Sequence, residues 1–261
     1  MDLSLAGRHA VVGGASRGIG RASALALAEL GATVTLLARN EKQLRELCGM
    51  LDDSAGQRHA WLAVDYGAPV ALAAAVALRV SDHPAQILVN NTGGPPEGSA
   101  HDASTSDYVD AFSRHLLCSQ VLLQAVLPGM RAAGFGRVIN IISTSVKQPI
   151  PGLGVSNTVR GAVASWAKTL ASELGPDGIT VNNVLPGFTQ TDRLEEVING
   201  MSQRSGRPRE EIEAQLRASV PLRRFALPAE TAAAVAFLAS PAASYINGIN
   251  LPVDGGRTGS L

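Results

Sequence analysis

The chain has 261 residues, of which 46% are hydrophobic and 17% charged, a composition that suits one large α/β domain with a sizeable core. Its 22 lysines and arginines balance 22 aspartates and glutamates, so no net charge favours nucleic acid or an anionic membrane as a partner. The two cysteines, Cys48 and Cys118, lie in unrelated surroundings and indicate a reducing compartment. The N-terminus lacks the pattern of a signal peptide, and the most apolar stretch, residues 70–80, is too short to span a bilayer and predicts a buried helix. We therefore expect a cytoplasmic protein without a metal site.

Apolar runs of strand length alternate with helical stretches along the whole chain. Strands are predicted near residues 9–13, 33–38, 59–64, 86–90, 137–142, 179–184 and 247–253. Helices are predicted near residues 18–30, 41–51, 69–80, 106–131, 154–174 and 229–239. This alternation implies crossover connections and a parallel sheet covered on both faces, hence a three-layer α/β/α fold. Because no linker or internal repeat interrupts it, residues 1–261 are expected to form a single domain.

The least regular region is residues 190–227, which we interpret as an insertion that forms a lid or substrate loop. It follows the carboxyl end of a predicted strand, where parallel sheets place such loops. It mixes apolar residues with arginines at positions 193, 204, 207, 209 and 217. That lining suits a substrate with an apolar body and a carboxylate or phosphate end, and an amphipathic lid has the same composition.

Three glycines separate the first predicted strand from the first predicted helix, in the stretch Gly14-Ala15-Ser16-Arg17-Gly18-Ile19-Gly20. Glycine permits positive φ and lets a diphosphate come within contact distance of the backbone, while the free N–H groups at the start of a helix attract a phosphate. A glycine-rich turn without a ligand has a similar composition. The position between a strand and a helix near the N-terminus favours a dinucleotide-binding site.

The end of the second predicted strand indicates which dinucleotide binds. Sites for NAD(H) usually keep an acid there for the ribose 2′-hydroxyl, whereas this strand ends in Ala38-Arg39-Asn40. Arg39 and Arg17 could pair with a 2′-phosphate, which favours NADP(H) over NAD(H), although both could also be solvated surface residues. Asp65 could accept a hydrogen bond from the adenine amino group or cap the helix that begins near Pro69.

Several ordered motifs resemble the short-chain dehydrogenase/reductase family, most closely its β-ketoacyl-reductase-like members. They are the glycine-rich stretch at 14–20, Asn90-Asn91-Thr92-Gly93, the strand at 136–143, the strand at 178–187, Tyr245-Ile246-Asn247-Gly248 and Val253-Asp254-Gly255-Gly256. The resemblance covers almost the whole chain. It implies a Rossmann-type, doubly wound, seven-stranded parallel sheet, a nicotinamide cofactor and commonly a tetramer.

The resemblance also assigns cofactor-binding roles along the chain. Asn90 and Gly93 would lie beside the cofactor's ribose and shape the floor of the site. The resemblance implies that Pro186 and Gly187 approach the nicotinamide, and that Thr189 and Thr191 are available to its carboxamide or to the diphosphate. A Pro-Gly pair is also typical of an ordinary turn.

The catalytic motif departs from the family's pattern. Ser143 matches the serine that hydrogen-bonds the substrate carbonyl, but the tyrosine expected thirteen residues later is Ser156, and the lysine four residues beyond that is Arg160. The family's tyrosine donates a proton as hydride arrives, and an alkyl hydroxyl is a far weaker acid than a phenol. Arg160 can bind ribose hydroxyls and supply a positive field, but it cannot relay a proton as lysine can.

Two other residues are candidates for the missing proton donor. His115 aligns with the family's site asparagine and titrates near neutrality by residue type. Lys147 lies on the loop that leaves the strand carrying Ser143. The alternative interpretation of His115 is a partly buried structural histidine with a hydrogen-bonded ring.

A stripe of apolar residues along the predicted helix 154–174 indicates packing or a subunit contact. Family members dimerise through this helix and its predecessor, so a homo-oligomer, a tetramer or a dimer, is expected, with strand 247–253 available for a second interface. The favoured function is an NADP(H)-dependent oxidoreductase acting on a small-molecule carbonyl or secondary alcohol. The alternatives are a catalytically degenerate protein that binds a dinucleotide as a sensor or partner subunit, and a lyase or isomerase that uses His115.

Overall fold

The computed structural model describes residues 1–260. Its seven strands form one sheet: β1 (His9–Gly13), β2 (Thr33–Ala38), β3 (Ala60–Ala63), β4 (Ile87–Asn90), β5 (Gly136–Ile141), β6 (Ile179–Pro186) and β7 (Asn250–Val253). All predicted strands are present, with bounds that differ by at most three residues. The Rossmann-type sheet and the single domain expected from the sequence are confirmed.

Every strand pair is parallel, and the strand order is β3-β2-β1-β4-β5-β6-β7. The order reverses between β1 and β4, which are neighbours in the sheet but far apart in the sequence. In open parallel sheets, ligands bind outside the carboxyl ends of the strands at such a point. The fold therefore places the candidate site beyond Gly13 and Asn90, where these two strands end.

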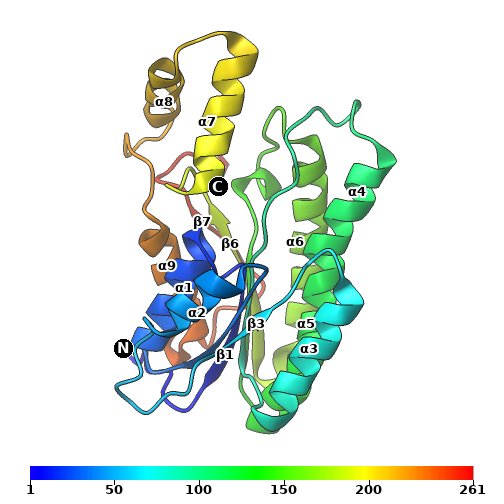
Figure 1. Cartoon of the computed structure of the whole chain (residues 1–261), viewed down its shortest axis with the longest axis vertical. Coiled ribbons are helices and arrows are strands. Elements are labelled where there is room, and N and C mark those ends of the chain that lie inside the picture. The colour runs from blue at the N-terminus through cyan, green and yellow to red at the C-terminus, as the bar shows by residue number, and fades with distance from the viewer. Residues whose placement is uncertain (261) are drawn as a thin grey trace.

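Helices cover both faces of the sheet (Figure 1). One face carries α1 (Gly18–Glu29), α2 (Glu41–Cys48) and α9 (Pro228–Ala239), and the other α3 (Pro69–Asp82), α5 (Cys118–Ala133) and α6 (Gly154–Leu174). Short 3-10 turns span Thr144–Val146, Gly175–Asp177 and Pro241–Ala243. Leu27, Leu36 and Leu44 are fully buried in the first layer, and Leu72, Leu122 and Met130 in the second.

The helix predicted over residues 106–131 consists of three parts. These are α4 (Thr105–Phe112), a π-helical turn (Ser113–Leu117) and α5. By length and apolar composition, Thr105–Ala133 is a helix that could cross a membrane, but its inner face packs in the core beneath the sheet. π-Turns occur frequently at functional sites, and this one places His115 in a buried position near the end of β4.

Helix α3 is buried along one side only, so the prediction of a buried helix over residues 70–80 is half right. Leu72, Val76 and Val80 pack in the core, whereas Val70 and Leu78 remain 85% and 74% exposed. The alanine-rich sequence conceals this difference, because alanine suits either environment.

Residues 190–227 are more regular than expected from the sequence, and their role as a lid or substrate loop stays a prediction. The segment contains two helices, α7 (Asp192–Ser205) and α8 (Arg209–Ala218), which project beyond the sheet (Figure 1). They enclose a small apolar cluster of Leu194, Ile198, Ile212, Leu216 and Phe225. The arginines that made the sequence look irregular form the solvated faces of these helices and pair with glutamates, as in Arg207–Glu211.

Candidate active site

The glycine-rich turn packs directly against the end of β4. Asn91 Nδ2 donates hydrogen bonds to the carbonyl oxygens of Gly13 (3.2 Å) and Gly14 (3.4 Å). A Cβ on Gly14 would lie 2.6 Å from Asn91 Nδ2, and one on Gly20 would lie 2.3 Å from the Gly14 carbonyl oxygen. Gly14 also has a φ of +56°. Only glycine fits these positions, so the spacing of the motif follows from close packing.

The turn leaves the N-terminus of α1 open to an anion. Arg17 precedes the helix in an extended conformation, and no side chain caps the first turn, in which Ile19 lies. Ser16 is half-buried beside it. Thr191, at the start of α7, faces the same turn, because a Cβ on Gly18 would lie 3.2 Å from Thr191 Cγ2. Uncapped N–H groups beside a threonine suit the diphosphate of a dinucleotide.

The two arginines expected at a 2′-phosphate differ in their surroundings. Arg17 Nη1 pairs with Asp192 Oδ2 at 2.7 Å, and both side chains are about two-thirds exposed (63% and 65%). Arg39 is exposed immediately after β2, and Asn40 next to it accepts a hydrogen bond from the Gln43 N–H and caps α2. Arg39 therefore offers a guanidinium at the predicted place, while a phosphate would compete with Asp192 for Arg17.

Asp65 does not cap α3. The N-cap residue is Ala68, and Asp65 Oδ1 accepts a hydrogen bond from the Gly67 N–H at 2.8 Å. The side chain is exposed after β3. The capping interpretation is therefore wrong, because the chain makes a turn between Asp65 and the helix. A contact with an adenine remains a prediction.

A ladder of buried asparagines runs across four strands at the carboxyl side of the sheet. Asn90 Nδ2 donates to Asn140 Oδ1, Asn140 Nδ2 to Asn183 Oδ1, and Asn183 Nδ2 to Asn250 Oδ1, each at 2.8 Å. The parallel register aligns these residues as direct neighbours on β4, β5, β6 and β7. Each inner amide uses its oxygen and its nitrogen within the ladder. Asn90 Oδ1, at the end of the ladder, has no hydrogen-bond partner within residues 1–260.

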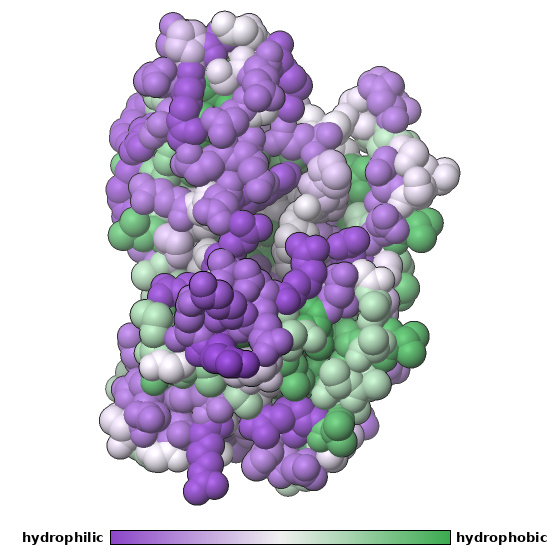
Figure 2. Space-filling model, viewed as in Figure 1, coloured by the Kyte–Doolittle hydropathy of each residue, from purple (hydrophilic) through white to green (hydrophobic). Residues whose placement is uncertain are grey.

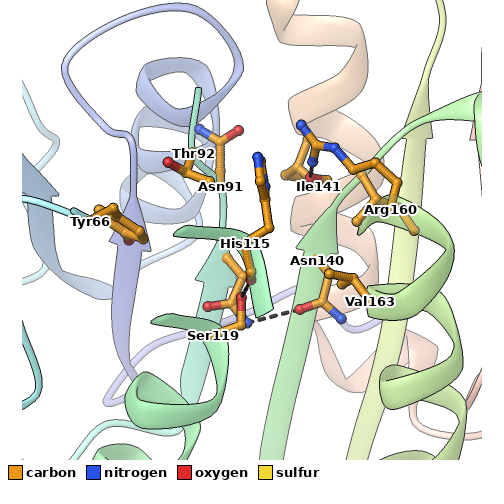
Figure 3. A pocket seen from close by; sticks show the side chains of 11 residues that line it. Tyr66, Asn91, Thr92, His115, Ser119, Asn140, Ile141, Arg160 and Val163 are labelled. Atoms are coloured by element: carbon orange, nitrogen blue, oxygen red, sulfur yellow. Dashed lines mark hydrogen bonds between the residues drawn. The ribbon is translucent and has the colours of Figure 1, made fainter. Parts of the chain in front are cut away.

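A small cavity of about 10 Å³, enough for one water molecule, lies beside this free end (Figure 3). Its lining includes Asn90, Asn91, His115 and Arg160, and the His115 ring and the Arg160 guanidinium both extend toward it (Figure 3). Arg160 Nε, like Asn90 Oδ1, is buried without a partner in the described chain. Buried polar atoms are rarely left unsatisfied, so this pair would be satisfied by a water molecule or by a polar group of a ligand that reaches the cavity.

Arg160 is a buried cation that no carboxylate balances within residues 1–260. It is 8% exposed, and its Nη1 donates to the Ile141 carbonyl oxygen at 2.7 Å. Burial, together with the nearby positive charge of Arg193, lowers its pKa to about 10. The guanidinium therefore remains charged at neutral pH and supplies a strong positive field in a site of low polarity.

His115 is neutral in this site. Burial lowers its pKa to about 2, and the positive charges of Arg160 and Arg114 act in the same direction. The prediction that it titrates near neutrality is wrong, because an imidazolium here would be both desolvated and repelled. A neutral ring can donate one N–H hydrogen bond, but it is not an acid at physiological pH.

The remaining catalytic candidates lie at the start of α6 and on the loop before it. Ser143 caps the 3-10 turn after β5, and its Oγ accepts a hydrogen bond from the Ser145 N–H at 3.1 Å. Lys147 follows this turn and is half-buried. Ser156 and Arg160 lie one turn apart on α6, as their spacing predicts. Of these four residues, only Arg160 lines the small cavity.

The segment after β6 is fixed by its own chain. The Gly187 N–H donates to the Val253 carbonyl oxygen at 3.0 Å, directly after Pro186 at the end of β6. Thr189 Oγ1 donates to the Gly187 carbonyl oxygen at 3.2 Å, and Thr191 Oγ1 to that of Thr189 at 3.3 Å. Gly93, in the loop after β4, is exposed, and the space around its α-carbon is open.

A second, larger cavity of about 410 Å³ lies beside the start of α4 and α6, lined by residues 96–99, 102, 103, 107 and 155. Arg204 of α7 reaches Glu97 of this lining at 2.5 Å. The space-filling view shows a hollow between the α7–α8 projection and α4 (Figure 2). Helix α7 therefore contacts the loop after β4.

Three residues contribute to the site in ways that the sequence did not predict. Asn91 orders the glycine-rich turn, Asn140 connects the asparagine ladder, and Arg193 acts on Arg160. Asn91 lies within a motif that the resemblance quoted, but its partners come from a strand far away in the sequence. Within residues 1–260, no group of three histidine, cysteine or acidic side chains could hold a metal ion.

Comparisons with known proteins agree with this fold. A family model described as "Enoyl-(Acyl carrier protein) reductase" matches residues 14–258. The 3-oxoacyl-[acyl-carrier-protein] reductase FabG of Pseudomonas aeruginosa is 34% identical over 97% of this chain and 98% of its own. The structure of L-sorbose reductase from Gluconobacter frateurii, complexed with NADPH and L-sorbose, is 32% identical, covers both chains fully and has a TM-score of 0.92. An actinorhodin polyketide ketoreductase variant with NADPH has a TM-score of 0.90 at 31% identity, over 97% of this chain and 98% of its own.

The doubly wound sheet and the glycine-rich turn at its switch point define a protein of the NAD(P)-dependent oxidoreductase class. More specifically, the chain belongs to the short-chain dehydrogenase/reductase family and is FabG-like.

Proposed function

We propose that this protein is an NADP(H)-dependent oxidoreductase that reduces a carbonyl group or oxidises a secondary alcohol. The observation that carries the proposal is the cavity whose lining includes three buried polar atoms, Asn90 Oδ1, Arg160 Nε and Tyr66 Oη, that have no partner in residues 1–260. That cavity lies at the sheet's switch point, next to a glycine-rich turn and an uncapped helix N-terminus. The NADPH complexes of two similar proteins support the choice of cofactor.

The residues present fit such a cofactor. The backbone of residues 14–20, with Ser16 and Ile19, would hold the diphosphate together with Thr189 and Thr191. Arg39, assisted by Arg17, would pair with the 2′-phosphate, and Asp65 would contact the adenine. Ribose and nicotinamide contacts would come from Asn90, Gly93, Arg160, Pro186 and Gly187.

When bound, the nicotinamide supplies or accepts a hydride. The protein's own groups act on the substrate oxygen, where negative charge develops as hydride adds to the carbonyl carbon. Arg160 supplies a fixed positive charge, and the neutral His115 ring supplies an N–H donor. Ser143 adds a hydroxyl donor at the end of β5. Fixed donors in a buried site stabilise such charge more strongly than water does.

The proton that completes an alcohol has to come from another group. Ser156 is too weak an acid, and His115 is neutral, so we assign this role to Lys147. Lys147 follows Ser143 by one 3-10 turn. A Lys147→Met variant should lose at least about tenfold in kcat, a typical effect of removing a general acid, whereas Lys147→Arg should lose as much because arginine does not release its proton. Full turnover by both variants would exclude Lys147.

A second candidate function is a dinucleotide-binding protein without turnover. It is favoured by one observation: Ser156 occupies the position one turn before Arg160, where a phenol would have to lie. Ketones, ketoacids and secondary alcohols incubated with NADPH or NADP⁺ separate the two candidates, because any oxidation or reduction of the nicotinamide excludes a purely binding role. We do not propose a lyase or isomerase based on His115, since a ring with a pKa of about 2 is also a poor base.

We also propose a homo-oligomer, located in the cytoplasm. Three large apolar side chains on α4 and the following turn, Val109, Phe112 and Leu117, are 67%, 39% and 45% exposed in the isolated chain. Trp166 on α6 lies half-buried near this region and donates from Nε1 to Gln120 Oε1 at 2.9 Å. Light scattering should report a dimer or tetramer, and a Phe112→Asp variant should reduce its size. A wild-type monomer at micromolar concentration would contradict the proposal.

A further inference from the structure

Two arginines converge on the exposed loop after β4. A methyl group on Gly94 would lie 3.9 Å from Arg160 Nη2 and 3.9 Å from Arg193 Nε. Arg160 reaches this point from α6 and Arg193 from α7, so the two cations come from opposite sides of the site. The space beside Gly93 is open. The loop Gly93–Gly94 thus has two guanidinium groups beside it and no side chain of its own.

The charges of this pair are incompletely balanced. Arg160 is more than nine-tenths buried, its Nη1 is used by the Ile141 carbonyl oxygen, and its Nε has no partner in the described chain. Arg193 Nη2 donates to the Pro95 carbonyl oxygen at 3.0 Å, and its Nη1 pairs with Glu196 at 3.2 Å on the solvent side, where both side chains are about half exposed (41% and 57%). Such an exposed pair is weak, so Glu196 offsets little of the charge of Arg193.

We propose that Arg160 and Arg193 form a subsite for an anionic group of the substrate, and that this group is a carboxylate. Planar guanidinium groups match the two oxygens of a carboxylate, and a desolvated cation gains most from such a partner. This inference rests on the proposed function, and it restricts the substrate class to ketoacids and hydroxyacids. In the reduction, hydride adds to the ketone carbon and a proton to its oxygen, giving the hydroxyacid while NADPH becomes NADP⁺.

An anion in this subsite would connect two parts of the structure. Arg160 belongs to α6 and Arg193 to α7, so an anion held between them would join α7 to the body of the site. The Arg193–Pro95 and Arg204–Glu97 contacts already connect the same two parts. A substrate without the negative charge would lose this connection.

The test compares acids with neutral esters. Pyruvate, acetoacetate and levulinate place the carboxylate at three distances from the ketone, and their methyl esters are the matched neutral probes. Binding is measured as the rise in Tm of the NADPH-saturated protein, which requires no turnover, and as KM where turnover occurs. At least one acid should bind about tenfold or more tightly than its ester, the usual strength of a charge-assisted pair.

Arg193→Gln should remove this preference for the acid, and Arg193→Lys should restore part of it. The matched control is Arg207→Gln, an exposed arginine between α7 and α8 that pairs with Glu211 and should leave the preference unchanged. If no acid is preferred over its ester in the wild type, the proposal is wrong, even if the protein reduces neutral ketones. If Arg193→Gln instead weakens NADPH binding and leaves the acid preference intact, the pair binds the cofactor's diphosphate and the proposal is likewise wrong. If the acids raise the Tm without turnover, the subsite stands and the oxidoreductase function does not.

Discussion

Arg160 Nη1 donates a hydrogen bond of 2.7 Å to the carbonyl oxygen of Ile141, so the backbone of β5, and not a carboxylate, fixes the buried guanidinium. This bond orients the planar group and leaves its Nε and Nη2 free to act in the site. No carboxylate within residues 1–260 pairs with the guanidinium, so its charge is available to the substrate. The arrangement explains how the site could stabilise charge without the phenol that the family resemblance leads one to expect.

Replacing Arg160 by methionine should lower kcat by about 100-fold or more, the usual loss when a donor to a developing oxyanion is removed. Arg160→Lys keeps the charge and should retain more activity than Arg160→Met. Circular dichroism and the free energy of unfolding should show that Arg160→Met folds, because removing an unbalanced buried charge does not destabilise the protein in the way that breaking an ion pair does. The same measurements check the folding of Arg160→Lys. Turnover by Arg160→Met within twofold of wild type would contradict the role assigned to Arg160.

The pKa of His115 predicts a specific loss of stability in acid. The unfolded chain binds a proton on this ring near the ordinary pKa of 6.5, whereas the folded chain does so only near pH 2. The free energy of unfolding should therefore be highest above about pH 6.5 and fall as the pH decreases below it, by up to ~1.4 kcal/mol per pH unit for this one group. Burial also lowers the pKa of His9 to about 4, so this residue adds to the loss of stability as the pH falls from about 6.5 to about 4.

Urea unfolding of a His115→Gln variant between pH 5 and 7 checks this prediction, and its dependence on pH should be shallower than that of the wild type. His101 is exposed, so His101→Gln is the control and should leave the slope unchanged. Between pH 5 and 7, the rate should depend on pH in the same way in the wild type and in His115→Gln. Equal slopes in wild type and His115→Gln would mean that the ring is not neutral in the folded protein.

The asparagine ladder should contribute strongly to stability. Asn140→Ala removes two of its three hydrogen bonds and leaves buried amide atoms of Asn90 and Asn183 without partners. Each of these two atoms costs about 1–3 kcal/mol, so the free energy of unfolding should fall by roughly 2–6 kcal/mol. Asn199→Ala, at an exposed position that binds only Arg209, should change it by less than about 1 kcal/mol. A similar small change for Asn140→Ala would show that the ladder does not stabilise the sheet.

Arg39 should decide between the two dinucleotides. Arg39→Asp places a carboxylate where the sequence has none, so NADPH binding should weaken by about tenfold or more through loss of a charge-assisted pair and gain of repulsion. NADH binding should be unchanged or tighter, because a carboxylate can accept from the ribose 2′-hydroxyl. Fluorescence titration with both nucleotides measures this shift. Arg58→Asp, a substitution of another arginine outside the site, is the control; an equal effect on NADPH would point to general charge and not to Arg39.

The sequence predicted the sheet well because each strand is a short apolar run between turn residues, and the buried parallel sheet requires that pattern. It also located the glycine-rich turn and the aligned positions 156 and 160, since these depend on spacing within one turn or one helix. The two helices at 192–218 were missed because their apolar residues cover only one face, and paired charges dominate the rest.

The electrostatics of the site could not be predicted from the sequence. His115 looks like a neutral-pH acid by residue type, and only its burial beside Arg160 and Arg114 shows that it is not. Likewise, Arg193 lies 33 positions after Arg160 and acts on it only because α7 folds back over the loop after β4. Such effects depend on contacts between distant elements, which no local pattern records.

The most direct test of the central claim is a titration of the purified protein with NADPH and, in parallel, with NADH, following the fluorescence of the nicotinamide. We expect saturable NADPH binding that is at least about tenfold tighter than NADH binding, in keeping with Arg39 and the absence of an acid after β2. Absence of binding by either nucleotide would contradict the account, because the glycine-rich turn, the open helix N-terminus and the unpartnered atoms of Asn90 and Arg160 would then serve no dinucleotide.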